Sequence, residues 1–367
     1  MFRNTFVNSF VLLSLIFISS CNSPQPELKK DVSGLLVKPY PSETYGLGLN
    51  RLSEYGFFKQ PLNLLEPVNE RVMPYELNAP LFTDYASKKR FIYFPEGVAP
   101  AKYVKDDVVL DFPLGTIIIK NFYYKGEQLS GQDKIIETRL LIHSEKTKQW
   151  ETLPYVWNEE QTEAYLYILG KDVDVNFSKT EQEAPIHFTY SVPNVNMCKS
   201  CHINNKNIIP IGPSPMQLHR LNKGLGDVNQ LSYMNSHQFL DKADVNGIEK
   251  IANYDNDTIS IQKRAKAYLQ ANCAHCHNEV GSAKTSGLHL TSHQEDEYRI
   301  GINKAPIAAG QGSGDLQYGI VKGNPDASIL VYRMSHTEPN IVMPEVGKNL
   351  VHTEGVALIR EWIQQMK

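Results

Sequence analysis

Apolar and polar positions divide the chain into stretches with different patterns. Residues 6–18 are mostly apolar. Between about residues 47 and 190, short runs of β-branched and aromatic residues alternate with polar or glycine-containing breaks, a pattern typical of antiparallel strands. From about residue 257 onward, apolar residues recur at helical spacing. We therefore expect a β-rich region followed by a helical one.

The strand pattern is clearest in five runs, which are residues 116–124, 136–143, 150–157, 163–169 and 186–190. Several short strands at this spacing predict an antiparallel sandwich or a barrel-like domain over residues 47–190.

Two segments carry the helical pattern. Residues 258–272 place Ala265, Tyr268 and Leu269 on one face, and a second helix is expected to open at Thr353 with a broad apolar face.

The spacing of the cysteines indicates which cofactor the chain binds. Four of the five belong to two pentads, Cys198-Lys-Ser-Cys201-His202 and Cys273-Ala-His-Cys276-His277. Cys-x-x-Cys-His is the signature of covalent c-type haem attachment, because two thiols at this spacing can form thioethers with one porphyrin while the histidine binds the iron. The sequence predicts two covalently bound haem c groups, with His202 and His277 as iron ligands. A four-thiolate zinc site or a disulfide within each pair is the alternative.

The fifth cysteine, Cys21, ends the apolar segment. That segment follows Arg3 and is shorter than the roughly 20 apolar residues that cross a bilayer, so residues 1–20 are interpreted as a cleaved signal. The ending Ser-Ser-Cys21 resembles a bacterial lipoprotein box, which implies lipidation of Cys21, and Asn22 in place of Asp favours the outer membrane. Ordinary cleavage nearby, with Cys21 incidental, is the alternative. Residues 21–46 are expected to form a tether.

The region after the second pentad resembles a class I cytochrome c domain. The resemblance rests on the helix leading into Cys273, the final helix, and the Met-Pro loop at residues 340–347. It implies that the two helices pack across each other and that Met343 is the distal iron ligand, with Met334 as its rival. Pro344 favours Met343, because the residue before a proline is held in extended geometry.

The distal ligand of the first haem is less determined. Met216 follows a proline-rich turn after His202 and is preferred over His219, while Met234 and His237 are further candidates. An open iron position is also considered, since ligand-binding or peroxidase chemistry needs one.

As a whole the chain resembles exported bacterial di-haem c-type cytochromes, most of which are conserved hypothetical proteins. The resemblance implies a multidomain α+β fold, in which an antiparallel β sandwich or barrel-like domain precedes mainly α-helical cytochrome c-type haem domains. In chain order, the predicted parts are a signal peptide (1–20), a tether (21–46), a β-rich domain (47–190), a first haem segment (191–245) and a cytochrome c-like domain (246–367).

The net charge and the predicted export signal indicate the class of function and the compartment. A net charge of −3 gives no basic surface for nucleic acid. We expect an electron carrier in the cell envelope, periplasmic or surface-facing, anchored in the outer membrane by its lipid and exchanging electrons with redox partner proteins. A haem-dependent, peroxidase-like oxidoreductase with a catalytic first haem is the alternative, as is a partner-binding β domain with the haems as its redox reporter.

Overall fold

The computed structural model describes residues 48–129, 131–180, 182–307 and 309–367. These residues all belong to one compact unit. The predicted signal at 1–20, Cys21 and the tether at 21–46 lie outside the described residues. The three predicted regions that follow them fall within this one unit, and the boundaries near residues 190 and 245 stay predictions.

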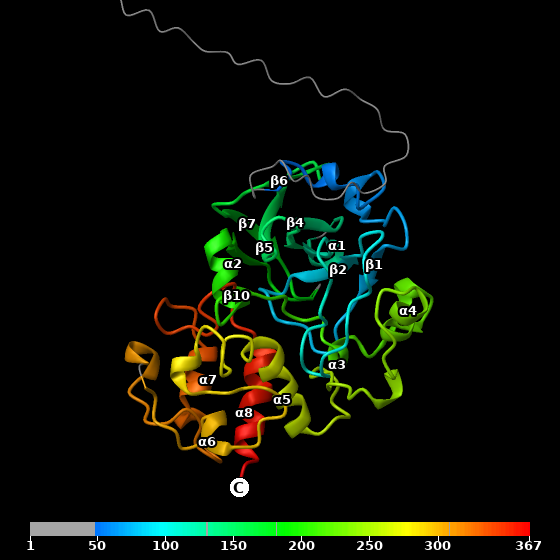
Figure 1. Ribbon diagram of the computed structural model, residues 1–367. Helices are drawn as coiled ribbons and strands as arrows, with labels where there is room; N and C mark the ends of the chain where they lie inside the picture. The colour runs from blue at the N-terminus through cyan, green and yellow to red at the C-terminus, as the bar shows by residue number, and fades with distance from the viewer. Residues whose placement is uncertain (1–47, 130, 181, 308) are drawn as a thin grey trace, which may run out of the picture. The chain divides into compact units, whose positions relative to one another are not determined.

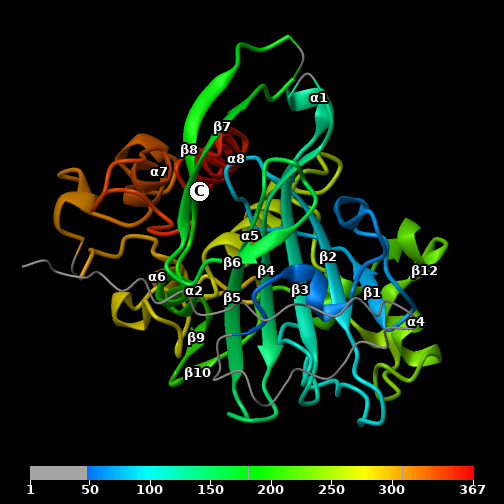
Figure 2. The same ribbon diagram turned by 90° about the horizontal axis from the view of Figure 1, so that it is seen from above.

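The largest element is a six-stranded antiparallel meander, in which every strand pairs with the next along the chain (Figures 1 and 2). Its strands are β1 (Val72–Tyr75), β2 (Ser87–Tyr93), β3 (Ile117–Tyr124), β4 (Lys134–His143), β5 (Trp150–Trp157) and β6 (Ala164–Leu166). The next two strands, β7 (Lys171–Phe177) and β8 (Ile186–Val192), form a separate hairpin. The predicted strands are found, but the expected sandwich or barrel is wrong, since the described residues form one open sheet and smaller two-stranded pairs.

Alternation along the strands gives the sheet two different faces. One face carries residues such as Phe91, Ile119 and Leu140, which pack against the segment from Leu52 to Leu65. The opposite face carries Ile92, Ile118 and Leu141 and packs against residues that follow the first pentad. Both faces are therefore covered, and the second one faces the pentads.

Short elements connect the sheet to the helical part. The remaining pairs are β9 (Ile203–Asn204) with β10 (Asn207–Ile208) and β11 (Leu221–Asn222) with β12 (Val228–Asn229). The helices are α1 (Gly126–Leu129), α2 (Val195–His202), α3 (Pro215–Leu218), α4 (Gln230–Ser236), α5 (Ile261–Asn272), α6 (Glu297–Ile300), α7 (Ile329–Met334) and α8 (Thr353–Gln364). In Figure 1, α2 and β10 lie between the strands and the group formed by α5 to α8.

Helices α5 and α8 pack against each other, as the resemblance to a class I cytochrome c domain implied. Tyr268 of α5 and Ile359, Trp362 and Ile363 of α8 belong to one buried cluster. The approach is close, because a Cβ atom at Gly355 would meet the ring of Tyr268. The Trp362 indole also donates to Gln262 Oε1 over 2.8 Å.

The prediction of mainly α-helical haem domains is wrong. The described chain is dominated by β structure and loops, and only α5 and α8 reach 12 residues. Between them the chain turns repeatedly instead of continuing a helix. Gly287, Gly301 and Gly314 have φ values of 62°, 111° and 56° and end single helical turns, a left-handed conformation that glycine adopts readily.

Candidate functional site

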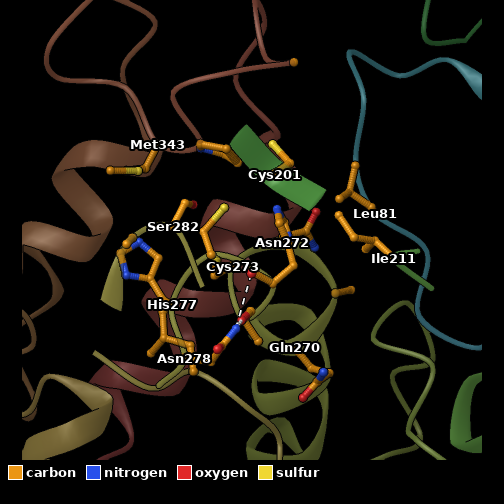
Figure 3. A pocket seen from close by; sticks show the side chains of 18 of the residues that line it. Leu81, Cys201, Ile211, Gln270, Asn272, Cys273, His277, Asn278, Ser282 and Met343 are labelled. Atoms are coloured by element: carbon orange, nitrogen blue, oxygen red, sulfur yellow. Dashed lines mark hydrogen bonds between the residues drawn. The ribbon is translucent and has the colours of Figure 1, made fainter. Parts of the chain in front are cut away.

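Both pentads line the same cavity, although the chain separates them widely. The cavity has a volume of about 840 Å³ and is lined by all four pentad cysteines and by His202 and His277. This volume is near the upper end of the roughly 300–1,000 Å³ typical of small-molecule and cofactor sites. Figure 3 shows Cys201, Cys273 and His277 around the hollow, with Met343 across a gap from His277.

Local structure explains how each pentad is presented. Helix α2 begins after Asn194, whose side chain accepts the amide of Met197, and it carries the first pentad in its last turns. The cap satisfies a helix amide that would otherwise lack a partner. Helix α5 ends at Asn272, and the second pentad follows in the turn, where the amides of Cys276 and His277 donate to the carbonyl of Cys273.

The two pentads touch through their second cysteines. Cys201, Cys276 and His275 place ligand atoms within 4.8 Å of one another. The Cys201 thiol donates to Cys276, which raises the pKa of Cys201 and lowers that of Cys276. This contact brings the two pentads together inside the cavity.

His202 is held in one tautomer. The side chain is buried at 8% exposure, and its Nδ1 lies 2.7 Å from the carbonyl oxygen of Ile209. A carbonyl can only accept, so Nδ1 carries the proton and Nε2 keeps a free lone pair. Burial lowers the pKa of His202 to about 3, and the ring is therefore neutral at physiological pH. This is the state that binds a metal.

His277 is oriented by the same logic. Its Nδ1 lies 3.0 Å from Ser286 Oγ, whose own proton goes to the carbonyl of Ala283 over 2.7 Å. The serine must therefore accept from Nδ1, which leaves the His277 Nε2 lone pair free. Burial lowers the pKa of His277 as well.

Met343 and Met334 both line the cavity, as the two candidates for the second site require. They differ in their packing: Met334 is 6% exposed and belongs to the buried core cluster, whereas Met343 is half-buried outside it. Lys348 Nζ donates to the carbonyls of both, over 2.6 and 3.1 Å, and so holds the Met-Pro loop against α7. The assignment of Met343 as distal ligand stays a prediction.

The candidates for the first site lie elsewhere. Met216 is 1% exposed in the core cluster, His219 binds the Ile248 carbonyl through Nδ1, Met234 is buried under the sheet, and His237 stacks on Tyr233. None of these four side chains lines the cavity that holds His202. The preferred candidate Met216 is thus a core residue in this structure, and its role as an iron ligand stays untested.

His275, the third residue of the second pentad, faces the cavity as well. It lines the cavity beside Cys276, and its Nδ1 is buried without a hydrogen-bond partner among the described residues. An unpaired buried ring nitrogen is costly, and it indicates that this part of the cavity is shaped for something besides the protein chain.

A set of basic residues on the sheet wall of the cavity was not predicted from the sequence. They are Lys88 and Arg90 on β2, Lys120 on β3 and Arg139 on β4. The available signal was the presence of cations among buried positions of three neighbouring strands. Without the register of the strands, these positions could not be aligned.

The donor set fits two c-type haems better than a four-thiolate zinc site. The four described cysteines are free thiols, and each pentad offers two of them with one histidine whose Nε2 is available. The potential metal cluster among the described residues combines only Cys201, His275 and Cys276, so the four thiols do not converge. A cavity of this size with largely apolar walls suits a porphyrin.

Within the described residues, no helix is long and apolar enough to cross a membrane. Comparison of the chain with protein-family models, with curated proteins and with solved structures finds no match.

Proposed function

We propose that this protein is an exported di-haem c-type cytochrome that transfers electrons in the cell envelope. Cys198 and Cys201 hold one haem and Cys273 and Cys276 the other, with His202 and His277 as the iron ligands from the pentads. Met343 is the distal ligand at the second site. When bound, each haem supplies a one-electron Fe(III)/Fe(II) couple.

One observation carries this proposal. The two pentads line one cavity, and Cys201 and Cys276 are in contact within it. Two cofactors attached at these cysteines share an enclosure, so electrons can pass between them without a separate docking step. The oriented rings of His202 and His277 support the proposal independently, because each leaves the ring nitrogen that an iron needs.

Attachment at each pentad can be tested separately. We expect the wild type, exported with its maturation system, to carry two haems that survive acid-acetone extraction. The Cys198→Ser/Cys201→Ser and Cys273→Ser/Cys276→Ser variants should each retain one. A wild type that loses all of its haem on extraction, or a double variant that still carries two, would contradict the proposal.

A second function is favoured by the placement of the distal candidates. None of the four candidate distal ligands for the first haem lines the cavity. The site at His202 therefore suits a haem-dependent oxidoreductase with an open iron position. Carbon monoxide separates the two functions. Binding of one equivalent by the reduced wild type supports the oxidoreductase, whereas no binding leaves electron transfer alone. The Met343→Ala variant serves as the positive control, because it should open the second site.

The anchoring part of the proposal concerns residues outside the described structure. We propose that residues 1–20 are removed and that Cys21 is lipidated, which holds the protein at the outer membrane. Its redox partners are then proteins of the cell envelope.

A further inference from the structure

Three cations form a row across the sheet on the wall of the cavity. Arg90 of β2 pairs in register with Lys120 of β3, and Lys120 pairs with Arg139 of β4. Directly paired residues of antiparallel strands point to the same face. All three line the cavity together with the pentads, so the row faces the cofactor space rather than solvent.

Only one end of the row is neutralised. Glu137, which is fully buried, accepts two hydrogen bonds from the Arg139 guanidinium over 2.8 and 2.5 Å and one from the Tyr190 hydroxyl over 2.5 Å. Among the described residues, neither Arg90 nor Lys120 has a hydrogen-bond or ion-pair partner. Arg90 is nevertheless only 8% exposed.

The carboxylates near this wall have partners of their own. Glu76, whose charge acts on Arg90, pairs with Arg220 over 2.6 Å. Asp107, which also lines the cavity, pairs with Lys105 over 3.2 Å. Lys88 donates to the Ala86 carbonyl over 2.9 Å and is influenced by Asp84. The groups that influence Lys120 most are its cationic neighbours Arg139 and Arg90, which add to burial in lowering its pKa to about 7.

Adjacent buried cations without counter-charges are costly, because desolvation and mutual repulsion both oppose them. A ligand carrying negative oxygen atoms would offset both the desolvation of the two cations and the repulsion between them. An arginine next to a lysine provides several N–H donors in one place, which is the arrangement that carboxylates and oxyanions bind.

We propose that Arg90 and Lys120 form an anion-binding site on the sheet wall of the cavity, which takes a carboxylate or a small oxyanion beside the first haem. The placement beside a haem rests on the function proposed above. The anion has two possible sources, a propionate group of the haem itself or a free oxyanion that enters the cavity. The neighbourhood of the first pentad is supported by Lys120, whose charge influences both Cys198 and His202.

The test compares reduction potentials of the haem-loaded protein. Lys120→Met and Arg90→Gln each remove donors from the site, and Lys120→Arg retains the charge. Lys89→Met is the matched control, because Lys89 is the exposed neighbour of Arg90 on β2 and its removal changes the net charge equally. Each potential is measured in chloride and in sulfate at constant ionic strength.

A nearby positive charge stabilises the ferrous state, so its loss lowers the potential. We expect Lys120→Met to shift the oxidised-to-reduced ratio of one haem about tenfold at fixed potential, which is about 59 mV for a one-electron couple. Lys120→Arg, which keeps the charge, and Lys89→Met, which removes an exposed charge, should change this ratio little. The same two-haem content in all variants confirms that they fold and mature.

The source of the anion is decided by sulfate. If sulfate lowers the potential of the wild type and Lys120→Met removes this response, the site takes a free oxyanion. If the variants lower the potential but sulfate has no effect on the wild type, a haem propionate occupies it. Equal effects of Lys120→Met and Lys89→Met, together with no response to sulfate, would overturn the proposal.

Failure of the proposed function is distinguishable from failure of this site. If the isolated protein carries no haem, titration calorimetry with sulfate tests the site directly. Binding that Lys120→Met abolishes supports the site, and absence of binding to the wild type overturns it.

Discussion

The ion pair between Glu137 and Arg139 gives the sharpest quantitative prediction. Both residues are on β4, two positions apart and therefore on the same face, and Arg139 lines the cavity. Glu137 has no exposed surface, and its carboxylate accepts three hydrogen bonds, two from Arg139 and one from Tyr190. Replacement with Gln preserves shape but leaves Arg139 as a third uncompensated cation beside Lys120 and Arg90.

We expect Glu137→Gln to lower the free energy of unfolding by about 3–5 kcal/mol, the range for breaking a buried ion pair by removing one partner. Chemical denaturation of the haem-loaded protein, followed by far-UV circular dichroism, measures the change. Glu137→Leu/Arg139→Met should recover most of the loss, since a buried pair exchanged for apolar groups is often close to neutral.

An exposed pair serves as the control. Arg360 and Asp326 approach to 2.6 Å, but their side chains are 40% and 79% exposed. Solvent screens such pairs, so Asp326→Asn should cost no more than about 1 kcal/mol. The reasoning is refuted if Glu137→Gln costs no more than Asp326→Asn, or if the double variant is as unstable as Glu137→Gln alone.

Three further predictions concern other parts of the chain. Met343→Ala should lower the reduction potential of the second haem and let it bind carbon monoxide. Met216→Ala should leave both haem spectra unchanged and lower the free energy of unfolding by about 2–5 kcal/mol, because it truncates a core side chain. A spectral change in Met216→Ala would show that the core position is misassigned. Cys21→Ser should release the protein from the membrane fraction, and continued membrane association would mean another attachment. Burial raises the pKa of Asp84 to about 6, so its protonated form favours the fold and its contribution is lost as the pH rises through about 4 to 6. The free energy of unfolding of the wild type relative to Asp84→Asn should therefore fall over this window, and a difference that rises instead would contradict the sign.

Elements with a strong local signal could be predicted from the sequence. Strands β3, β4 and β5 and the helix that opens at Thr353 were located within a few residues, because their apolar patterns are long and regular. The pentads were found for a different reason, since their spacing is fixed by chemistry.

The arrangement of these elements was harder to predict. Six consecutive strands can form a sandwich, a barrel or an open meander with the same alternation, and only the pairing register decides between them. The C-terminal region was expected to be mainly helical from two good helices, but the loops between α5 and α8 are set by glycine-ended single turns and tertiary contacts.

In the site too, residues within a motif could be predicted, but residues that tertiary contacts bring to it could not. His202 and His277 could be named in advance, but their tautomers depend on Ile209 and Ser286, which no motif identifies. Met216 lies at a plausible distance along the chain and yet is in the core. The row of Arg90 and Lys120 requires strand register, which a single sequence does not contain.

The intact mass of the exported protein, measured under denaturing conditions, tests the central claim most directly. Thioether bonds survive denaturation, whereas zinc and noncovalent haem do not. We predict the mass of the mature polypeptide with its lipid group plus two haems. The polypeptide mass alone, or that mass less the hydrogens lost to disulfides, would contradict the account, as would the addition of only one haem.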